Sequence, residues 1–467
     1  MKRSNQKRMS MVFNIVISVV LLVAIVFLIK FAIEDYNKKT TIDPDKIEDV
    51  SDTPIFTAYT TDYVLAELED ADSAVDITAE LLEYLRDNNG DTTYATIVNY
   101  IESHKEYSDD MWKELFGASI RVLDYLAHQG QEGYDECTVI TSDKASCTLS
   151  FIGEVVLDDV WNWSPLYIHK KNLENILPAA FSTDVIAEMK NADILMANHS
   201  FAYRNNGKRN RDQANYLYYG SANANVSILK EMGIDIVNIG NDHTNDYQIS
   251  AFNDTLEVLR GEGIAYVGGG VDKQDALTPR YFIAGGMKIA YVAMAESATK
   301  AGAPAVGETS SGIVLGSNTK LYAGMIDTAR KNADYVIAYV DFNSYINGDA
   351  NASDAQAKLA RALVDRGVDA VIGSSNTTLQ EIEYYNGCPI VYSLGSFWHE
   401  TDPHNTIIFK IHFEDFIPQF YCVPCVQKNV VTNSVLATDK AKEIYAIITN
   451  PSMGKITIAD DGLVSEN

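Results

Sequence analysis

From about residue 147 onward, short apolar runs rich in β-branched and aromatic residues alternate with stretches of helical periodicity. The predicted strands are Thr148–Val156, Ala192–Asn198, Ile234–Gly240, Ile264–Gly268, Lys288–Met294, Tyr335–Asp341, Val368–Gly373 and Ile390–Phe397. The predicted helices between them are Ser182–Lys190, Ala222–Met232, Ser250–Glu262, Leu321–Lys331 and Asp354–Arg366. Alternation of this kind predicts an α/β domain with a largely parallel central sheet, over residues 147–467.

The last part of this domain is predicted to add antiparallel strands. Two apolar runs, Ile407–Phe413 and Tyr421–Val431, follow each other without a helical stretch between them. A helix at Asp439–Ile448 and a short strand at Lys455–Ile458 are expected to close the chain.

The N-terminal pattern is different, because Met11–Ile29 contains no charged residue. As a helix this segment is about 28 Å long, close to the thickness of the hydrocarbon core of a bilayer. Residues 1–10 carry basic residues and no acid, which favours a cytoplasmic N-terminus. A cleaved signal peptide needs small residues at the cut, and Phe31–Glu34 does not supply them. We therefore expect a single-pass anchor at 11–33 in the cell membrane, with the rest of the chain outside the cytoplasm.

Two segments connect the anchor to the α/β domain. Residues 34–54 are polar with proline breakers and are predicted to be a linker. Residues 55–135 show apolar positions at helical spacing, which predicts a small helical module whose aromatic residues form its core.

The chain is acidic, with a formal net charge of −27 from 64 acidic and 37 basic residues. This balance argues against nucleic acid as a partner. Five cysteines leave at least one unpaired within the chain. Cys137 and Cys147 flank a polar stretch between two β-like runs and could bridge a hairpin in an oxidising compartment. Cys422 and Cys425 form a lone CVPC, without the second pair that a zinc site of this type needs.

Polar residues gather where the predicted strands end. The clearest case is Gly233–Tyr247, in which an apolar run stops and Asn241, Asp242 and His243 follow. Ligands of open α/β sheets bind at the carboxyl ends of strands, where a carboxylate beside an imidazole can bind a metal or move a proton. The alternative is a polar turn whose side chains cap backbone groups. The expected cleft-lining residues are Asn198, Asn241, Asn343, Ser374, Ser375, Asn376 and Ser396.

Several of these stretches resemble one known family. GIDIVNIGNDH, RGVDAVIG and YSLGSF occur in the order found in the capsule-synthesis protein CapA family, the poly-γ-glutamate synthesis proteins of the calcineurin-like metallophosphoesterase superfamily. The likeness covers roughly Thr148 to Gly462. It implies a four-layer, metallophosphatase-like α/β sandwich and a role in the synthesis, export or retention of poly-γ-glutamate or a capsule-like polymer.

The resemblance also implies metal and phosphate ligands at the strand ends, and here the chain departs from the family. The family's Asn-Asn-His is Asn241–Asp242–His243, whereas its Gly-His-His-Pro-His corresponds to residues 373–377, which contain no histidine. The oxygen ligands that remain suit one Mn²⁺, Mg²⁺ or Ca²⁺ ion better than zinc, and binding of no metal is the alternative. The candidate metal ligands are Glu154, Asp242, Asp341 and His199, and the candidate catalytic residues are Asp242 and His243. For His199, a packed or solvent-facing side chain is the alternative.

A basic loop is the second candidate site. Tyr203–Arg211 reads YRNNGKRNR and contains no acid, so Arg204, Lys208, Arg209 and Arg211 form a candidate anion-binding group. A solvated loop is the alternative.

The expected partners are the membrane, an anionic envelope polymer such as poly-γ-glutamate, and membrane synthase subunits. Two main functions are open: a non-catalytic polymer-handling protein with a degenerate metal site, or an active metal-dependent phosphoesterase or polymer hydrolase. In a third, the chain is a scaffold that recruits synthase partners through its membrane helix.

Overall fold

The computed structural model describes residues 136–140 and 146–466, apart from gaps at 159, 172–174, 204–206, 213–216, 221, 299–301, 344–347, 375–376 and 450–455, and a few residues between 113 and 125. The predicted tail 1–10, anchor 11–33 and linker 34–54, and most of the helical module 55–135, lie outside the described residues. Among the helices of the described part, none is long and apolar enough to cross a membrane.

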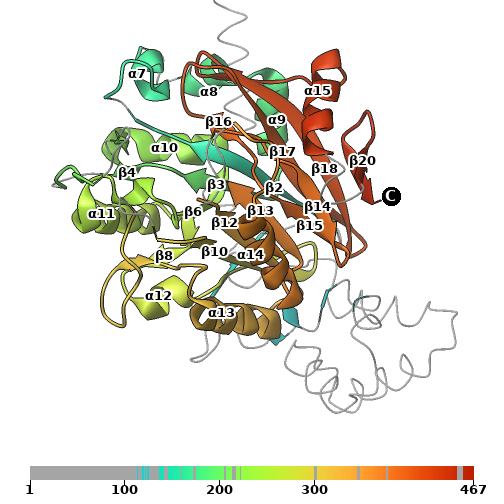
Figure 1. Ribbon diagram of the computed structural model, residues 1–467, viewed down its shortest axis with the longest axis horizontal. Helices are drawn as coiled ribbons and strands as arrows, with labels where there is room; N and C mark the ends of the chain where they lie inside the picture. The colour runs from blue at the N-terminus through green and yellow to red at the C-terminus, as the bar shows by residue number, and fades with distance from the viewer. Residues whose placement is uncertain are drawn as a thin grey trace, which may run out of the picture. The chain divides into compact units, whose positions relative to one another are not determined.

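Two large β-sheets form the described domain (Figure 1). The seven-stranded sheet has the order β1 (Cys137–Val139), β9 (Arg280–Ala284), β10 (Met287–Ala295), β12 (Tyr335–Asp341), β13 (Ala370–Ser374), β15 (Cys388–Val391), β14 (Ile382–Tyr385). The ten-stranded sheet has the order β20 (Ile456–Ile458), β21 (Leu463–Glu466), β18 (Ile417–Lys428), β17 (His404–Glu414), β2 (Ser146–Val155), β3 (Ile194–His199), β6 (Ile234–Asn238), β7 (Ala265–Val267), with β16 (Ser396–Trp398) on β2 and β19 (Val431–Ser434) on β18. Two short pairs are β4 (Ala202–Tyr203) with β5 (Tyr219–Gly220), and β8 (Gly269–Gly270) with β11 (Gly312–Ile313).

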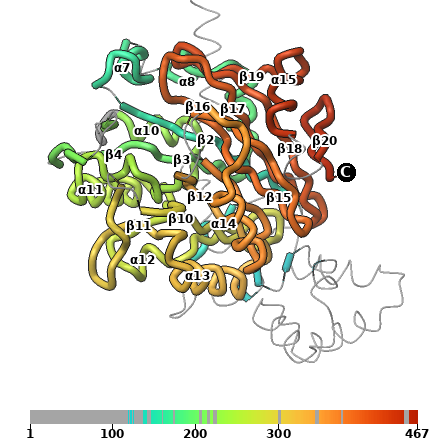
Figure 2. The backbone as a smooth tube through the Cα atoms, in the orientation of Figure 1, coloured from blue at the N-terminus to red at the C-terminus, as the bar shows by residue number. Residues whose placement is uncertain are grey.

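Most of the helices cover the outer faces of the two sheets, whereas the last helix, α15, packs Ile444 and Ile448 into the core between the sheets (Figures 1 and 2). Their bounds are α7 (Pro165–His169), α8 (Ile176–Ala180), α9 (Thr183–Lys190), α10 (Ala222–Met232), α11 (Gln248–Gly261), α12 (Lys273–Leu277), α13 (Thr319–Asn332), α14 (Asp354–Asp365), α15 (Asp439–Ile448) and the short 3-10 helix η4 (His243–Asn245). Helices α8 to α11 share a core with the outer face of β2 and β3, and α13 and α14 share another with β10 and β12.

A third core joins the inner faces of the two sheets. Strand alternation directs Leu149 and Phe151 of β2 toward the other sheet, and Ile152 toward the helices. Phe151 meets Tyr291 of β10 with ring centroids 6.3 Å apart. The order of layers is therefore helices, ten-stranded sheet, seven-stranded sheet, helices. The mixed α/β class predicted from the sequence is confirmed.

The prediction of one largely parallel central sheet is wrong, because the strands divide between two mixed sheets. The predicted strand Ile390–Phe397 is in fact two strands, β15 and β16, in different sheets. Gly395 has a φ of +72° at this break, a conformation that favours glycine. Likewise, the predicted strand Tyr421–Val431 contains a tight turn at Asn429 and Val430, whose φ angles are +53° and +56°.

The proposed hairpin bridge between Cys137 and Cys147 is also wrong. Cys137 lies opposite Tyr281 in the seven-stranded sheet, whereas Cys147 lies opposite Phe413 in the ten-stranded sheet. All five cysteines are free. The short spacing between the two cysteines is typical of a hairpin. It contains no information about the sheet that each of β1 and β2 joins.

Candidate functional site at the strand ends

The carboxyl ends of strands from both sheets meet at one place. Glu154 of β2 is in register with Asn198 of β3, and Asn198 is in register with Asn238 of β6. In the other sheet Asp341 of β12 is in register with Ser374 of β13. The strand alignment therefore brings together most of the polar strand ends that the sequence singled out.

Asn198 is the centre of this arrangement, and it is fully buried. Its side-chain nitrogen donates to the hydroxyl of Ser374 at 2.9 Å and to that of Ser200 at 3.2 Å. Its side-chain oxygen accepts from the amides of Asn238 at 2.9 Å and Asn241 at 3.0 Å. The bond to Ser374 connects the two sheets, so this one amide fixes their strand ends relative to each other.

Two buried carboxylates flank this amide. Glu154 accepts from the hydroxyls of Ser200 at 3.1 Å and Ser396 at 2.9 Å, one on each oxygen. Asp341 accepts from the hydroxyl of Ser374 at 3.2 Å. Burial and the negative charges of Asp242 and Glu154 raise the pKa of Asp341 well above its usual range. The buried carboxyl groups of this site therefore resist being ionised all at once.

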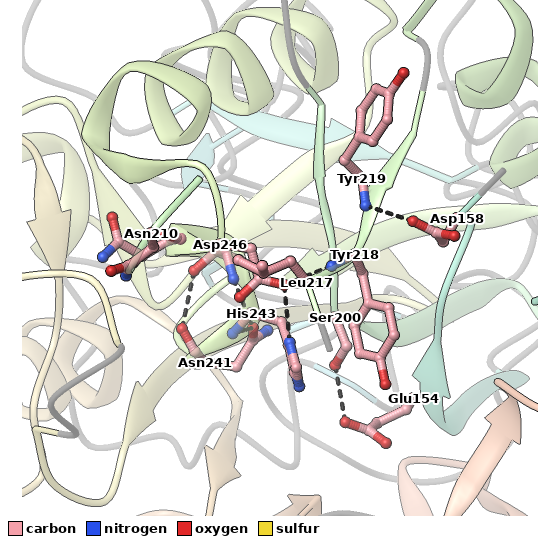
Figure 3. A network of polar contacts seen from close by, with 12 residues as sticks. Glu154, Asp158, Ser200, Asn210, Leu217, Tyr218, Tyr219, Asn241, His243 and Asp246 are labelled. Carbon is pink, nitrogen blue, oxygen red and sulfur yellow. Dashed lines mark hydrogen bonds and ion pairs between the residues drawn. The ribbon is translucent and has the colours of Figure 1, made fainter. Parts of the chain in front are cut away.

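His243 lies at the start of η4, on the loop that follows β6 (Figure 3). Its Nδ1 is 3.0 Å from a carboxylate oxygen of Asp246, which is fully buried. Burial lowers the pKa of His243, but the charges of Asp246, Asp242 and Glu154 outweigh this effect and raise the pKa to about 10. The imidazole is therefore a cation at neutral pH, able to donate a proton but not to accept one.

Tyr218 and His399 complete this side of the site, and sequence reasoning missed both. The ring of Tyr218 lies 4.5 Å from that of His243, and its backbone N–H donates to Asp246 at 2.7 Å. The Tyr218 hydroxyl is 3.0 Å from Nε2 of His399. Asp246 could have been found from the sequence, because it lies three residues after His243 in a loop that forms a helical turn. No sequence pattern connects Tyr218 and His399 with His243, because they come from other segments of the chain.

His199 points away from the carboxylates. Adjacent residues of a strand face opposite sides, so Asn198 faces the other sheet and His199 faces the helix side, stacked on Phe201 at 3.8 Å. Neither ring nitrogen has a hydrogen-bond partner among the described residues, and burial lowers its pKa to about 3. The packed histidine that the sequence left as an alternative is the observed placement.

The other predicted residues lie at the edge of this group. Asn343 is held by Ser297, whose hydroxyl donates to the Asn343 side-chain oxygen at 2.7 Å, and by Glu296, which accepts from the Asn343 backbone N–H at 3.1 Å. Asp242 is half-buried beside His243. Ser375 lies outside the described residues, as do Asn376 and Arg204.

The basic loop forms a separate concave site. Lys208, Arg209 and Arg211 are exposed and, with Leu217 and Gln248 among their neighbours, line a hollow of about 870 Å³. We call this the cationic hollow. The loop is fixed to the histidine segment because the backbone N–H of Asn210 donates to the carbonyl of Asp246 at 2.8 Å. The strand-end site and the cationic hollow are thus connected through Asp246.

The strand-end residues do not fit a two-metal centre. Within the described part of the chain, no three histidine, cysteine, aspartate or glutamate side chains gather closely enough to hold a metal ion. Both oxygens of Glu154 accept serine hydroxyls, and Nδ1 of His243 is paired with Asp246. A metal ion needs several ligands at fixed positions, and these paired side chains do not supply them. One bound Mn²⁺, Mg²⁺ or Ca²⁺ ion stays a prediction.

The fold and site define a class: a mixed α/β sandwich of two sheets with a polar site where their strands end. Residues 148–401 match the bacterial capsule synthesis protein PGA_cap family. This match spans more than half of the chain, so the protein belongs to that family, and the resemblance found in the sequence is confirmed.

Individual relatives agree with this assignment. The chain is 34% identical over 173 residues to the PGA biosynthesis protein CapA of Bacillus subtilis (strain 168), covering 37% of this chain and 44% of the relative. It is 24% identical over 279 residues to the capsule biosynthesis protein CapA of Bacillus anthracis, covering 57% of this chain and 64% of the relative. The matches thus span less than two thirds of either relative. The structure of Haemophilus influenzae NAD nucleotidase aligns with a TM-score of 0.37 at 12% identity, covering 68% of this chain and 65% of that one.

Proposed function

We propose that this protein is a membrane-anchored, extracytoplasmic component that handles an anionic capsule-like polymer, such as poly-γ-glutamate, during its synthesis, export or retention. Membership of the capsule synthesis family supports a role in capsule synthesis. The names of the Bacillus relatives, which refer to PGA and capsule biosynthesis, support poly-γ-glutamate as the polymer. In this proposal the metallophosphatase-type domain binds polymer rather than cleaving it, and membrane synthase subunits are its partners.

The observation that carries this proposal is the cationic hollow. Three exposed basic side chains, Lys208, Arg209 and Arg211, gather in a chain whose net charge is −27. A local positive site on an acidic surface attracts an anionic ligand and orients it, while the remaining surface repels nonspecific contacts. A polymer with a carboxylate on every repeat can fill such a site without a unique binding register.

The test is binding of a γ-linked glutamate oligomer to the full-length chain in mild detergent, measured by calorimetry. Replacing Lys208, Arg209 and Arg211 together by alanine should weaken binding about tenfold or more, and should reduce its dependence on salt. The matched control replaces Lys320, Lys331 and Lys428, which are exposed at other places on the domain. Equal losses in both triple variants would contradict the proposal.

A second candidate function is a metal-dependent phosphoesterase or polymer hydrolase. It is favoured by the negative charges of Asp242 and Glu154, which act on the buried Asp341 and raise the pKa of its carboxyl group. Metal analysis of the purified chain and an assay on a generic phosphate ester with added Mn²⁺ distinguish the two functions. Stoichiometric metal together with turnover that Asp242→Ala abolishes would establish the enzyme and overturn the non-catalytic proposal.

A further inference from the structure

Four aromatic side chains form a connected cluster beside His243, which we call the aromatic wall: the half-buried Trp161 and Trp163 and the buried Tyr218 and His399. The indoles of Trp161 and Trp163 are stacked, with centroids 6.0 Å apart and planes 14° from parallel. Trp163 meets Tyr218 edge-on at 6.0 Å and His399 edge-on at 6.4 Å. Each ring therefore holds the next in a fixed orientation.

One hydrogen bond connects the aromatic wall to a residue that lines the cationic hollow. The indole N–H of Trp161 donates to the carbonyl of Leu217 at 2.9 Å, and Leu217 lines the hollow. Two buried aspartates hold this junction, as Figure 3 shows for the segment around Tyr218. Asp158 accepts from the backbone N–H groups of Trp161 at 2.8 Å and Tyr219 at 2.9 Å, and Asp246 accepts from that of Tyr218.

The two tryptophans are only partly covered by the protein. Both pack one side against the helix-side core and are half-buried, and the residues beside them, Val160 and Asn162, are exposed. Val160 alone leaves 49% of its surface accessible. Large aromatic side chains that stay partly exposed in a rigid arrangement are typical of ligand-binding surfaces.

We propose that Trp161 and Trp163 of the aromatic wall are a second binding subsite, which packs against the methylene and amide groups of a γ-linked glutamate chain whose carboxylates occupy the cationic hollow. This inference rests on the proposed function and names how its polymer is recognised. Each γ-glutamyl repeat carries one carboxylate and two consecutive methylene groups, so the polymer presents charge and apolar surface in alternation. The hollow alone would bind any polyanion, whereas the wall and hollow together favour one with carbon-rich spacers.

The test compares two ligands on the full-length chain: a γ-linked glutamate oligomer and an inorganic polyphosphate of equal charge, which has no methylene groups. Trp163→Ala should weaken binding of the glutamate oligomer about three- to tenfold and leave polyphosphate binding unchanged. Trp163→Phe keeps an aromatic face and should retain most of the affinity. Tyr421→Ala removes a half-exposed aromatic residue on β18 and serves as the control, with no effect on either ligand.

The outcomes separate this inference from the proposed function. If Trp163→Ala binds both ligands as the parent does, the wall has no part in recognition and the inference fails, while the charge-based function stands. If the parent chain binds neither ligand, the proposed function fails. Equal weakening of the binding of both ligands would also overturn the assignment. Unchanged melting temperatures of the variants exclude misfolding as the cause.

Discussion

Buried polar side chains, rather than exposed ones, hold the site together at the scale of single residues. The Asn198 side chain donates from its nitrogen to Ser374 of the other sheet and accepts on its oxygen from Asn238 of its own sheet. Asp246 has a comparable role on the loop, since it pairs with His243 and accepts from the backbone of Tyr218. Leaving a buried partner unsatisfied costs more than an average hydrogen bond contributes, so single substitutions here have large, measurable effects.

The His243–Asp246 pair should make stability depend on pH. The pKa of His243 is raised above its unfolded value of about 6.5, so its stabilising effect is complete below that pH and is lost as the pH rises through about 10. Asp246→Asn keeps an acceptor for Tyr218 but removes the charge. We expect it to lower the free energy of unfolding by about 3 kcal/mol near pH 6.5 and to flatten its fall between pH 6.5 and 10.

Denaturant unfolding across this pH range measures the effect, and NMR titration of the imidazole gives the pKa directly. Asp246→Asn removes the strongest of the charges that raise the pKa of His243, so this pKa should fall. A titration midpoint unchanged by the substitution would show that Asp246 is not what keeps the imidazole protonated.

Replacing Asn198 by leucine tests the connection between the sheets. Leucine has the same branched arrangement of heavy atoms but no polar atoms, so Ser374, Asn238 and Asn241 would each lose a partner while buried. We expect a loss of about 3 kcal/mol in the free energy of unfolding. Ser434→Ala, on the surface strand β19, should change it by less than about 0.5 kcal/mol. Equal stability of Asn198→Leu and the parent would contradict the role given to this amide.

At the scale of elements, local sequence patterns predict where helices and strands occur better than they predict which strands pair with each other. Helix α14 is a good example, because Ser353 and Gln356 form a capping box at its start and the periodicity after it is clear. The predicted bounds of this helix match the observed ones to one residue. The division of Ile390–Phe397 between two sheets was not predictable, because hydrophobicity is the same on both sides of Gly395. Strand order depends on contacts between residues far apart, which periodicity does not record.

Close packing of two strand ends makes one glycine indispensable. A Cβ atom on Gly153 of β2 would lie 1.7 Å from the carbonyl oxygen of Gly395. Gly153→Ala should therefore shift β2 away from β16 and destabilise the domain by about 3 kcal/mol or more, as measured by thermal and denaturant unfolding. The matched control is Gly324→Ala in α13, where the Cβ meets nothing within 4 Å. This second change should stabilise the protein by about 0.5–1 kcal/mol, and the opposite order of stabilities would refute the packing argument.

At the scale of the whole molecule, family membership links the chain to capsule synthesis, and the sequence predicted part of its polar site. The sequence located the polar strand ends correctly, since Glu154, Asn198, Asp341 and Ser374 lie close together. It did not show that serine hydroxyls would satisfy both oxygens of Glu154, nor that Tyr218 and His399 would join His243. Such partners come from segments that fold next to each other, and a linear pattern contains no information about them.

The location of the protein is tested by removing its first segment. Deleting residues 11–33 should move the chain from the membrane fraction to the soluble fraction, because no other apolar stretch of this length precedes the domain. Fractionation followed by immunodetection measures this, with a protease added to intact cells to show which side the domain occupies. Retention of the deletion variant in the membrane fraction would mean that another part of the chain binds there. Replacing the segment by an unrelated anchor should preserve function, unless the helix itself recruits synthase partners.

The pairing of β2 with β17 has a consequence for how the protein is made. β2 is an internal strand of the ten-stranded sheet, and its Phe151 pairs with Phe409 of β17. Because β17 is synthesised late, one edge of β2 stays unpaired until nearly the whole chain has been made. Contacts between such distant residues give a high contact order and slow folding. An open strand edge meanwhile invites aggregation. We therefore expect the nascent chain to depend on chaperones during its delivery, and a product truncated before residue 404 to aggregate rather than to form a smaller stable domain.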